Sequence, residues 1–468
     1  MNREMSAAVD HLYGLPRFTK KNSLAHTRRL LELLGDPCEK RRIIHVAGSN
    51  GKGSVCNFLY HMLLAGGVSA AMFSSPHLMD IRERFSINGE LVGEEEFLSA
   101  YDRVSEAVQT LTEWGEPYPT FFEFVYAIAM VLFEEAGATY VILETGLGGR
   151  LDATNSFSSP ELTVITQIAL EHTEILGETI EEIAKEKAGI LKAGVPVVCA
   201  ADTPEAFRVI AAHAAELGCP VTAVLQAEEE DLSPELSPLL SDEHEISETF
   251  CRISKINENS IDFSLSSDYD KKIIWRVPGR ALYQVENAAL AIEAMRLFCR
   301  MPDEVLKAGL LEAKWPGRMQ EVLPEIWFDG AHNPAGITAF LESARELTKE
   351  DAFPPLLLFS MVKEKDLATS AKLLAAGMPW DTVAVTTIPE DRGVDPETIA
   401  ALFSRDADRM PENTRARNVE CFYDCREAFF QMRDRKQKRQ KLFCTGSLHF
   451  IGTLMEILEE EIGGKYGF

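Results

Sequence analysis

Residues 41–54 of the chain read RRIIHVAGSNGKGS, and this segment indicates the architecture of the protein. Its apolar run ends at Val46 and leads directly into a glycine-rich turn, after which residues 55–65, VCNFLYHMLLA, have helical spacing. A strand, a glycine-rich loop and a helix in this order are typical of a loop that binds phosphate through backbone N–H groups and the helix N-terminus. The segment therefore predicts a nucleotide site near the start of an α/β domain.

Two side chains of this loop suit a nucleotide. Lys52 adds a full positive charge, and Ser54 can offer a hydroxyl to a bound magnesium ion. The strict phosphate-loop consensus is broken twice, since Val46 stands in place of its first glycine and Gly53 separates the lysine from the serine. From the pattern alone, a glycine-rich strand–helix turn with an exposed lysine is the alternative interpretation.

Polar side chains follow four strands of this first part of the chain. Apolar runs at 68–75, 140–144 and 162–168 predict further strands of a parallel sheet covered on both faces, and 121–136 predicts a long buried helix. The side chains that follow these strands and the first one are Lys52, Ser75, Glu144 and His172. Because the carboxyl ends of parallel strands meet at one edge, we expect a site for a divalent ion there, with magnesium favoured and manganese a reasonable substitute.

The next part of the chain continues the alternation and then changes character. The predicted elements are helices at 179–187 and 204–217 around a strand at 195–200, a small antiparallel element over 249–277, and a helix at 284–299. Residues 226–248 are acidic, contain two Ser-Pro pairs and show no clear period, so we expect a surface insertion.

A second strand and helix alternation begins near residue 318. Strands are predicted at 319–328, 355–360, 381–386, 418–423 and 441–445, with helices at 335–347, 365–375, 395–404, 424–434 and 448–461. The stretch 300–316, with a proline near each end, is the predicted hinge. We therefore expect two α/β domains: residues 1–312 form a nucleotide-binding, P-loop ATPase-type domain with a mostly parallel sheet and helices on both faces, and residues 313–468 form a smaller Rossmann-like domain.

Composition excludes several classes of protein. The chain has 468 residues, 46% hydrophobic and 26% charged, which are globular values. With 47 Lys and Arg against 73 Asp and Glu, its formal net charge is −26, so a general basic field for nucleic acid is absent. We expect no signal peptide and no membrane span. Nine cysteines without a CxxC pair suggest reduced thiols in the cytoplasm.

An ordered set of motifs resembles a known family. The motifs are HVAGSNGKGS (45–54), SSPHL (74–78), ERFSING (83–89), TFFEF (120–124), ETGLGGRLDATN (144–155), ITQIALEH (165–172), EKAGILKAGVP (186–196), ENAALA (286–291), WPGRMQ (315–320) and FDGAHNP (328–334). Together they resemble the folylpolyglutamate synthase / dihydrofolate synthase family of the Mur ligase superfamily.

The resemblance implies an ATP-dependent amide ligase built from two α/β domains. In that family a carboxylate of the acceptor takes the γ-phosphoryl group of ATP, and the amine of L-glutamate then attacks the acyl phosphate. The acceptor is a folate or dihydropteroate, and members are usually monomers. Alternatives that the sequence leaves open are a Mur-type ligase acting on another carboxylate acceptor and a P-loop kinase or ATPase.

The resemblance also assigns roles to individual residues. For ATP it implies Asn50, Gly51, Lys52, Gly53, Ser54, Asn287, Arg318 and Asp329; for the metal it implies Ser75, Glu144 and His172. For catalysis it implies Lys52, His332 and Lys187, the last carbamylated so that it can hold a second magnesium ion; for the substrate it implies Arg84, with Arg82 an equal candidate, and Ser447.

This chain departs from the family pattern at three of the relevant positions. Glu171 stands where the family often has aspartate before His172, Tyr283 stands where it usually has histidine, and Ser49 replaces the usual threonine of the phosphate loop. Glutamate is one methylene longer than aspartate, so we expect any role of that carboxylate in orienting its neighbours to shift.

Overall fold

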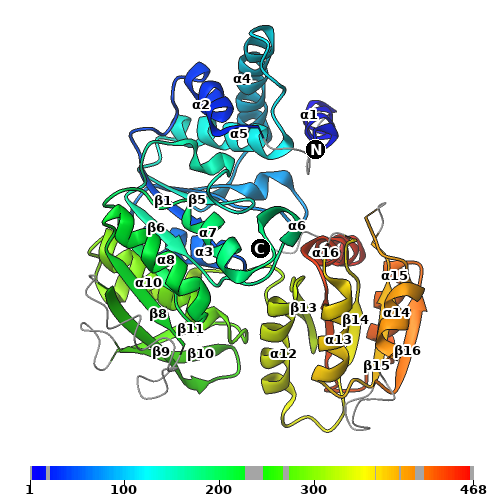
Figure 1. Ribbon diagram of the computed structural model, residues 1–468. Helices are drawn as coiled ribbons and strands as arrows, with labels where there is room; N and C mark the ends of the chain where they lie inside the picture. Colours follow the sequence, from blue (N-terminus) through cyan, green and yellow to red (C-terminus); the bar gives the residue numbers. More distant parts are fainter. Residues whose placement is uncertain are drawn as a thin grey trace.

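The computed structural model describes residues 3–16, 22–226, 246–266, 273–363, 365–388, 392–405 and 416–463. It contains two α/β units, each built around its own sheet (Figure 1). Most of the predicted acidic insertion lies outside the described residues. In the part of the chain that is described, no helix is both long and apolar enough to cross a membrane.

The first sheet has eleven strands in the order β11-β10-β9-β8-β7-β6-β1-β5-β2-β3-β4. The strands are β1 (Arg42–Ala47), β2 (Ala70–Phe73), β3 (Phe85–Ile87), β4 (Glu90–Leu91), β5 (Tyr140–Glu144), β6 (Leu162–Ile165), β7 (Val197–Ala200), β8 (Val221–Leu225), β9 (Ile246–Ile256), β10 (Ser260–Ser266) and β11 (Ile274–Pro278). Strands β2, β5, β1, β6, β7, β8 and β9 pair in parallel, while β9, β10 and β11 are antiparallel, as are β2, β3 and β4.

Helices cover both faces of this sheet because its strands are apolar on both sides. In β1, Ile44 and Val46 pack with α3 (Lys52–Ala65), α10 (Gln284–Phe298) and α11 (Asp303–Glu312). Ile43 faces the opposite side, where α1 (Arg3–Gly14), α2 (Leu24–Leu33), α4 (Glu94–Glu113) and α5 (Phe121–Glu135) pack. Further along that side lie α6 (Thr173–Leu176), α7 (Ile180–Ala188) and α8 (Pro204–Leu217). The 3-10 helices η1 (Ile81–Arg84) and η2 (Ala153–Ser156) complete this unit.

The second sheet has six strands in the order β12-β13-β17-β14-β15-β16. These strands are β12 (Gln320–Leu323), β13 (Ile326–Asp329), β14 (Leu356–Phe359), β15 (Thr382–Thr386), β16 (Asn418–Phe422) and β17 (Leu442–Thr445). One face packs against α12 (Pro334–Thr348), α13 (Leu367–Gly377) and α14 (Pro396–Arg405), and the other against α15 (Cys425–Arg435) and α16 (Leu448–Ile462). The predicted two-domain α/β fold is thus confirmed, while the exact boundary at residue 312 stays a prediction.

Two expectations for the region between the sheets were wrong. The stretch 319–328 is not one strand but the antiparallel pair β12 and β13, which turns at Pro324 and Glu325. The predicted hinge at 300–316 contains α11, a regular helix that packs directly on α3. A Cβ at Gly309 would collide with the backbone of Met62, so the two helices approach closely there.

Candidate active site

The glycine-rich loop lies where the sequence placed it, between β1 and α3. Gly51 precedes Lys52, the first residue of α3, and has a φ of +91°, a backbone conformation that favours glycine. A Cβ at Gly51 would also collide with Oδ1 of Asn287. The loop therefore requires glycine at this position both for its own conformation and for its contact with α10.

Two lysines meet at this loop. Nζ of Lys52 donates to the carbonyl oxygens of Gly48, at 2.8 Å, and Ser49, at 3.1 Å. Nζ of Lys187 in α7 donates to the same Gly48 oxygen, also at 2.8 Å, and its side chain is only 1% exposed. Lys52 therefore provides a local positive charge for an anion in a chain of net charge −26.

Lys187 is paired with Glu171. Its Nζ lies 2.7 Å from Oε1 of the glutamate, and both side chains are buried. Burial lowers the pKa of Lys187 to about 8 although Glu171 opposes the change. Burial would raise the pKa of Glu171, but the charges of Lys187 and Lys52, together with the hydrogen bond from Lys187, outweigh burial and bring the value to about 2. Glu186, the neighbour of Lys187, points away and pairs with Arg150 at 2.7 Å.

Glu144 ends β5 and is almost fully buried beside the loop. One of its oxygens accepts the backbone N–H of Ser75 at 2.9 Å. Burial raises its pKa, and the charges of Lys52, Arg318 and Arg84 oppose that rise. A Cβ at Gly53 would lie 3.5 and 3.6 Å from the two carboxylate oxygens, so the glycine leaves the space in front of them open.

The predicted metal ligands lie on neighbouring strands. Ser75, Glu144 and His172 follow β2, β5 and β6, and Lys52 follows β1, which lies between β5 and β6 in the sheet. Among the described residues, no three or more His, Cys, Asp or Glu side chains form a group that could hold a metal ion by themselves. The donors that fit magnesium at this edge are instead the Glu144 carboxylate and the serine hydroxyls, with space left open by Gly53.

His172 contacts the second domain. Its backbone is left-handed, with a φ of +46°, and it is the N-cap of α6. Its Nε2 lies 3.2 Å from Nζ of Lys365, which precedes α13. Burial, with the charge of Lys365, lowers the pKa of His172 to about 4. The histidine is therefore neutral at neutral pH and can act as a ligand for a metal ion.

Helix α10 begins directly against the phosphate loop. Nε2 of Gln284 donates to Oγ of Ser54 at 3.1 Å, and Oε1 of Gln284 accepts from Nδ2 of Asn287 at 3.0 Å. All three side chains are buried. The predicted ATP residues Ser54 and Asn287 thus belong to one hydrogen-bonded group, which sequence reasoning missed because the contact of Gln284 with Ser54 joins residues far apart in the chain.

Asp329 and Arg318 come from the second domain and face the first. Oδ2 of Asp329 accepts from the hydroxyl of Tyr283 at 2.7 Å and from the N–H of Met319 at 2.9 Å. Burial raises the pKa of Asp329, opposed by Tyr283 and by the charge of Arg318. The same arginine also acts on Glu144 in the first domain, so its positive charge is close enough to affect both carboxylates.

The loop after β13 carries two more site residues. Nδ1 of His332 donates to the carbonyl of Gly330 at 2.9 Å, and burial, with the charge of Lys365, lowers the pKa of the histidine to about 3. Asn333 donates from Nδ2 to Oδ1 of Asn50 in the phosphate loop at 2.9 Å. This loop therefore lies directly over the predicted nucleotide site.

The two arginines near the predicted acceptor site have different partners. Arg82 forms an ion pair with Asp80 at 2.6 Å. Arg84 is 6% exposed and donates from Nε to Nδ1 of His77 at 2.7 Å. The two candidates that the sequence left equal therefore have different described partners, a carboxylate for Arg82 and an imidazole for Arg84, and which of them binds the substrate stays a prediction.

Ser447 occupies a structural position. It is the N-cap of α16, where its Oγ accepts the N–H of Phe450 at 3.1 Å, and it is buried. The hydroxyl is therefore used by its own helix, and a role in binding the amino acid stays a prediction.

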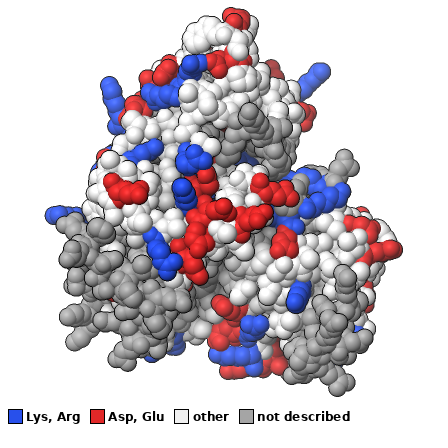
Figure 2. All heavy atoms as spheres, in the orientation of Figure 1, with Lys and Arg blue, Asp and Glu red and all other residues white. Residues whose placement is uncertain are grey.

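Charge is unevenly distributed around the site. Figure 2 shows Asp and Glu side chains gathered in the middle of the drawn face, in the region of α6 and α7, where Lys and Arg side chains lie beside them. The first turn of α7 alone carries Glu181 and Glu182. Acidic side chains in this region disfavour an anion at long range, so the lysines of the loop must act at short range.

Comparison with known proteins identifies the class. Residues 46–295 match the Mur ligase middle domain, and residues 317–448 match the glutamate ligase domain of Mur ligases. The dihydrofolate synthase/folylpolyglutamate synthase of Bacillus subtilis is 35% identical over 377 residues, which cover 78% of this chain and 81% of that protein. The folylpolyglutamate synthase of Lacticaseibacillus casei is 30% identical over 389 residues, covering 81% and 85%.

Solved structures agree with these matches. Escherichia coli FolC in complex with DHPP and ADP has a TM-score of 0.80 and 25% identity, covering 98% of each chain. The bifunctional folylpolyglutamate synthase/dihydrofolate synthase of Yersinia pestis, complexed with AMPPNP and an Mn ion, has a TM-score of 0.78 and 27% identity, covering 97% of this chain and 98% of that one. The class is that of the Mur ligases. Within it, the chain belongs to the folylpolyglutamate synthase/dihydrofolate synthase family, which confirms the resemblance of the motifs.

Proposed function

We propose that the protein is an ATP-dependent ligase that joins L-glutamate to the carboxyl group of a folate, with dihydropteroate as a further acceptor. The observation that carries the proposal is the convergence of cationic side chains from both domains on the glycine-rich loop. Lys52 comes from the first domain and Arg318 from the second, and the charges of both act on Glu144 beside the loop. Membership of the family supports the reaction type and the acceptor class.

In this proposal the chain's own groups position the γ-phosphoryl group. Transfer of a phosphoryl group depends mostly on positioning and on stabilising charge. Lys52 and the backbone N–H groups at the start of α3 would bind the phosphates, and Arg318 would neutralise charge from the other side. The hydroxyl of Tyr283 holds Asp329, the predicted ribose ligand, at 2.7 Å. An acceptor carboxylate is already ionised at neutral pH, so it attacks without a base.

The second half-reaction needs a proton acceptor for the amine of glutamate. His332 is a poor candidate for that role, because its pKa of about 3 leaves it a weak base. Its Nδ1 donates to a backbone carbonyl, so the neutral ring keeps Nε2 as an acceptor that can orient a ligand N–H or O–H group. We therefore propose that His332 orients the reacting groups.

The donors around Glu144 fit a magnesium ion, with manganese as a substitute. Ser75, Glu144 and His172 would hold it, and when bound the ion neutralises charge on the phosphates and the acceptor carboxylate. We propose that the neutral amine of Lys187 adds carbon dioxide and loses a proton, and that the resulting carbamate holds a second magnesium ion beside this site. A carbamate is an anion, so Lys187 would have to leave Glu171, 2.7 Å away, for the modification to occur.

The proposal is tested by product analysis. Incubation with ATP, magnesium and L-glutamate, separately with tetrahydrofolate and with dihydropteroate, should yield ADP, phosphate and a glutamyl product in equal amounts. Lys52→Ala should abolish turnover and leave the far-UV circular dichroism spectrum unchanged. Phosphate release that does not depend on glutamate would instead support a kinase or ATPase. Glutamyl transfer to a peptidoglycan precursor alone would support a different Mur-type ligase.

Three further properties belong to the same proposal. We propose that the enzyme acts as a monomer, that it works in the cytoplasm, and that nucleic acid and membranes are not among its partners. Light scattering on a sizing column should give a mass near 52.1 kDa. A dimer mass would contradict the first of these properties, and fractionation of cells would test the second.

A further inference from the structure

The guanidinium of buried Arg84 has one contact at its edge and another against its planar face. Arg84 ends η1, and its Nε donates to Nδ1 of His77 at 2.7 Å. Its Cζ lies 5.3 Å from the centre of the Phe121 ring. Because the group is planar, one bond at its edge and one ring against its face fix its orientation.

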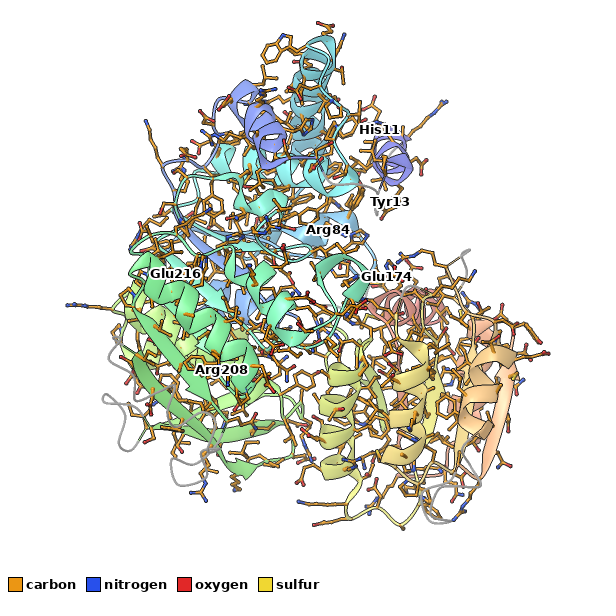
Figure 3. All side chains as sticks on the ribbon, viewed as in Figure 1. His11, Tyr13, Arg84, Glu174, Arg208 and Glu216 are labelled. Carbon is orange, nitrogen blue, oxygen red and sulfur yellow. The ribbon has the colours of Figure 1, made fainter. Side chains whose placement is uncertain are left out.

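Helix α1 contacts both of the groups that hold Arg84. The hydroxyl of Tyr13 lies 2.9 Å from Nε2 of His77. The Tyr13 ring stacks on His77 with centres 6.1 Å apart and on Phe121 with centres 6.0 Å apart. Figure 3 shows Tyr13 at the end of α1 that is nearer to Arg84, with His11 further along the helix. Tyr13 of α1 thus contacts both of the described groups that hold Arg84.

The hydrogen bonds of His77 have a fixed direction. Nε of an arginine can only donate, so Nδ1 of His77 must be the acceptor. The neutral imidazole then carries its proton on Nε2, which donates to the hydroxyl oxygen of Tyr13. Tyr13 therefore determines which way the His77 ring faces, and the ring determines where Arg84 points.

The position of Tyr13 is itself fixed by the packing of α1. Met5 and Leu12 are fully buried in the core that α4 and α5 share. On the same helix, His11 bonds the hydroxyl of Tyr101 at 2.9 Å and that of Tyr118 at 3.3 Å. Tyr13 is 38% exposed, so it combines a fixed backbone with a side chain that reaches the surface of the site.

Arg84 is also electrostatically connected to the reaction centre. Its charge acts on Glu144, the buried carboxylate beside the phosphate loop. An arginine at this place can pair with a carboxylate of the acceptor near the point of phosphoryl transfer. The orientation of its guanidinium therefore affects acceptor binding more than ATP binding.

We propose that Tyr13 is a positioning residue for the acceptor, which acts through His77 to hold the guanidinium of Arg84 in the orientation that receives an acceptor carboxylate. This inference rests on the proposed function, because it assumes a folate-type acceptor with an ionised carboxyl group. Helix α1 is then part of the acceptor site.

The test compares variants that each remove a different contact among Tyr13, His77 and Arg84. Tyr13→Phe keeps the ring and removes the hydroxyl. His77→Asn keeps an acceptor near the place of Nδ1 but loses the link to Tyr13. We expect each to raise the KM for the acceptor about 2- to 12-fold, the range for one hydrogen bond, with the KM values for ATP and glutamate unchanged. The double variant should be no worse than either single one.

Two controls separate positioning from general damage. Tyr118→Phe removes a comparably exposed hydroxyl that also bonds α1, and it should leave the acceptor KM unchanged. His77→Ala removes both bonds and should raise the acceptor KM further than Tyr13→Phe. Thermal unfolding of each variant shows whether it is folded.

Direct binding of a folate, followed by fluorescence without ATP, keeps the two proposals apart. An unchanged acceptor KM and affinity in Tyr13→Phe, or equal increases in all three KM values, would overturn the positioning role while the ligase activity stands. Absence of turnover in the wild type, with folate binding still weakened by Tyr13→Phe, would overturn the proposed function instead. A wild type that binds no folate at all would overturn both.

Discussion

At Gly53, the absence of a side chain leaves room beside the carboxylate of Glu144. A Cβ at this position would meet the Glu144 oxygens at 3.5 and 3.6 Å, which is ordinary van der Waals distance, so the chain can still fold. We predict that Gly53→Ala keeps or slightly raises the melting temperature, since alanine favours a helix over glycine by ~0.5–1 kcal/mol. It should nevertheless lower kcat/KM about 10- to 100-fold and raise the magnesium concentration needed for half-maximal rate.

A magnesium titration of the rate, beside a melting curve, checks this prediction. Gly14→Ala is the matched control, because nothing lies within 4 Å of the added Cβ there. An unchanged magnesium requirement in Gly53→Ala would mean that the space before Glu144 is not used by an ion.

The Glu171–Lys187 pair predicts how stability depends on pH. The pKa of Glu171 is about 2 in the folded protein, against an ordinary value of 4.5. Between these values the unfolded chain binds more protons than the folded one, so stability is lost as the pH falls through that window. The pKa of Lys187 is lowered from 10.5 to about 8, so between those values stability rises with pH.

We therefore predict that Glu171→Gln has a flatter melting temperature profile below pH 4.5 than the wild type. At neutral pH it should be less stable, because Lys187 then lacks its buried counter-charge. Melting curves in a series of buffers measure both effects. Glu174→Gln, a change at an exposed glutamate of α6, should leave the profile as it is in the wild type. Parallel profiles for the wild type and Glu171→Gln would contradict the prediction.

At the scale of elements, the strands that carry the site could be predicted because their signals are local. All five residues of β5 are buried, and a continuous apolar run ending in a carboxylate is readable from the sequence. Helix α5 begins at a capping box formed by Thr120 and Glu123, which also lies within a few residues. Each of these elements could therefore be predicted without knowing which residues far away in the chain pack against it.

The elements that were missed depend on turns and on packing. In the run 319–328, Pro324 marks the break between β12 and β13, and Glu325 completes the turn with a φ of +64° that its residue type does not suggest. Pro302 was interpreted as a hinge but is the N-cap of α11. Strand β8 was not predicted at all, although it pairs in parallel with both β7 and β9 and so connects the first strands of the sheet to its antiparallel end.

The same distinction between local signals and distant contacts applies to the residues of the site. Sequence order placed Lys52, Ser75, Glu144 and His172 at one edge of the sheet, because sheet topology fixes where strands end. It did not reveal that Lys187 bonds Glu171, or that Lys365 of the second domain contacts His172. Those pairs join residues far apart in the chain, and only the packing of helices and domains brings them together.

At the scale of the whole molecule, the two domains meet around the glycine-rich loop. Polar contacts join Asn50 to Asn333 and His172 to Lys365. Leu78 of the first domain packs against the core around α16, and Gly452 of α16 lies against its carbonyl oxygen. Because the predicted ATP ligands come from both domains, the geometry of the nucleotide site depends on how the domains are held together.

Asn333 allows this dependence to be tested, because its side chain makes two hydrogen bonds that a substitution can separate. Its Oδ1 caps α12 by accepting the N–H of Gly336 at 2.7 Å, while its Nδ2 reaches Asn50 in the other domain. Asn333→Ser keeps a good N-cap and removes the contact between domains. One hydrogen bond contributes ~0.5–1.5 kcal/mol, so we predict that kcat/KM for ATP falls about 2- to 12-fold with little change in melting temperature.

Small-angle scattering of the same variant should give a larger radius of gyration than the wild type without nucleotide, and the difference should disappear at saturating ATP. Asp366→Ser is the matched control, because it changes the cap of α13 in the same domain, where Oδ1 accepts the N–H of Thr369 at 3.1 Å. The control should leave ATP kinetics and the radius unchanged. If Asn333→Ser also leaves both unchanged, the contact with Asn50 does not hold the second domain over the phosphate loop, and the other contacts between the domains suffice for closure.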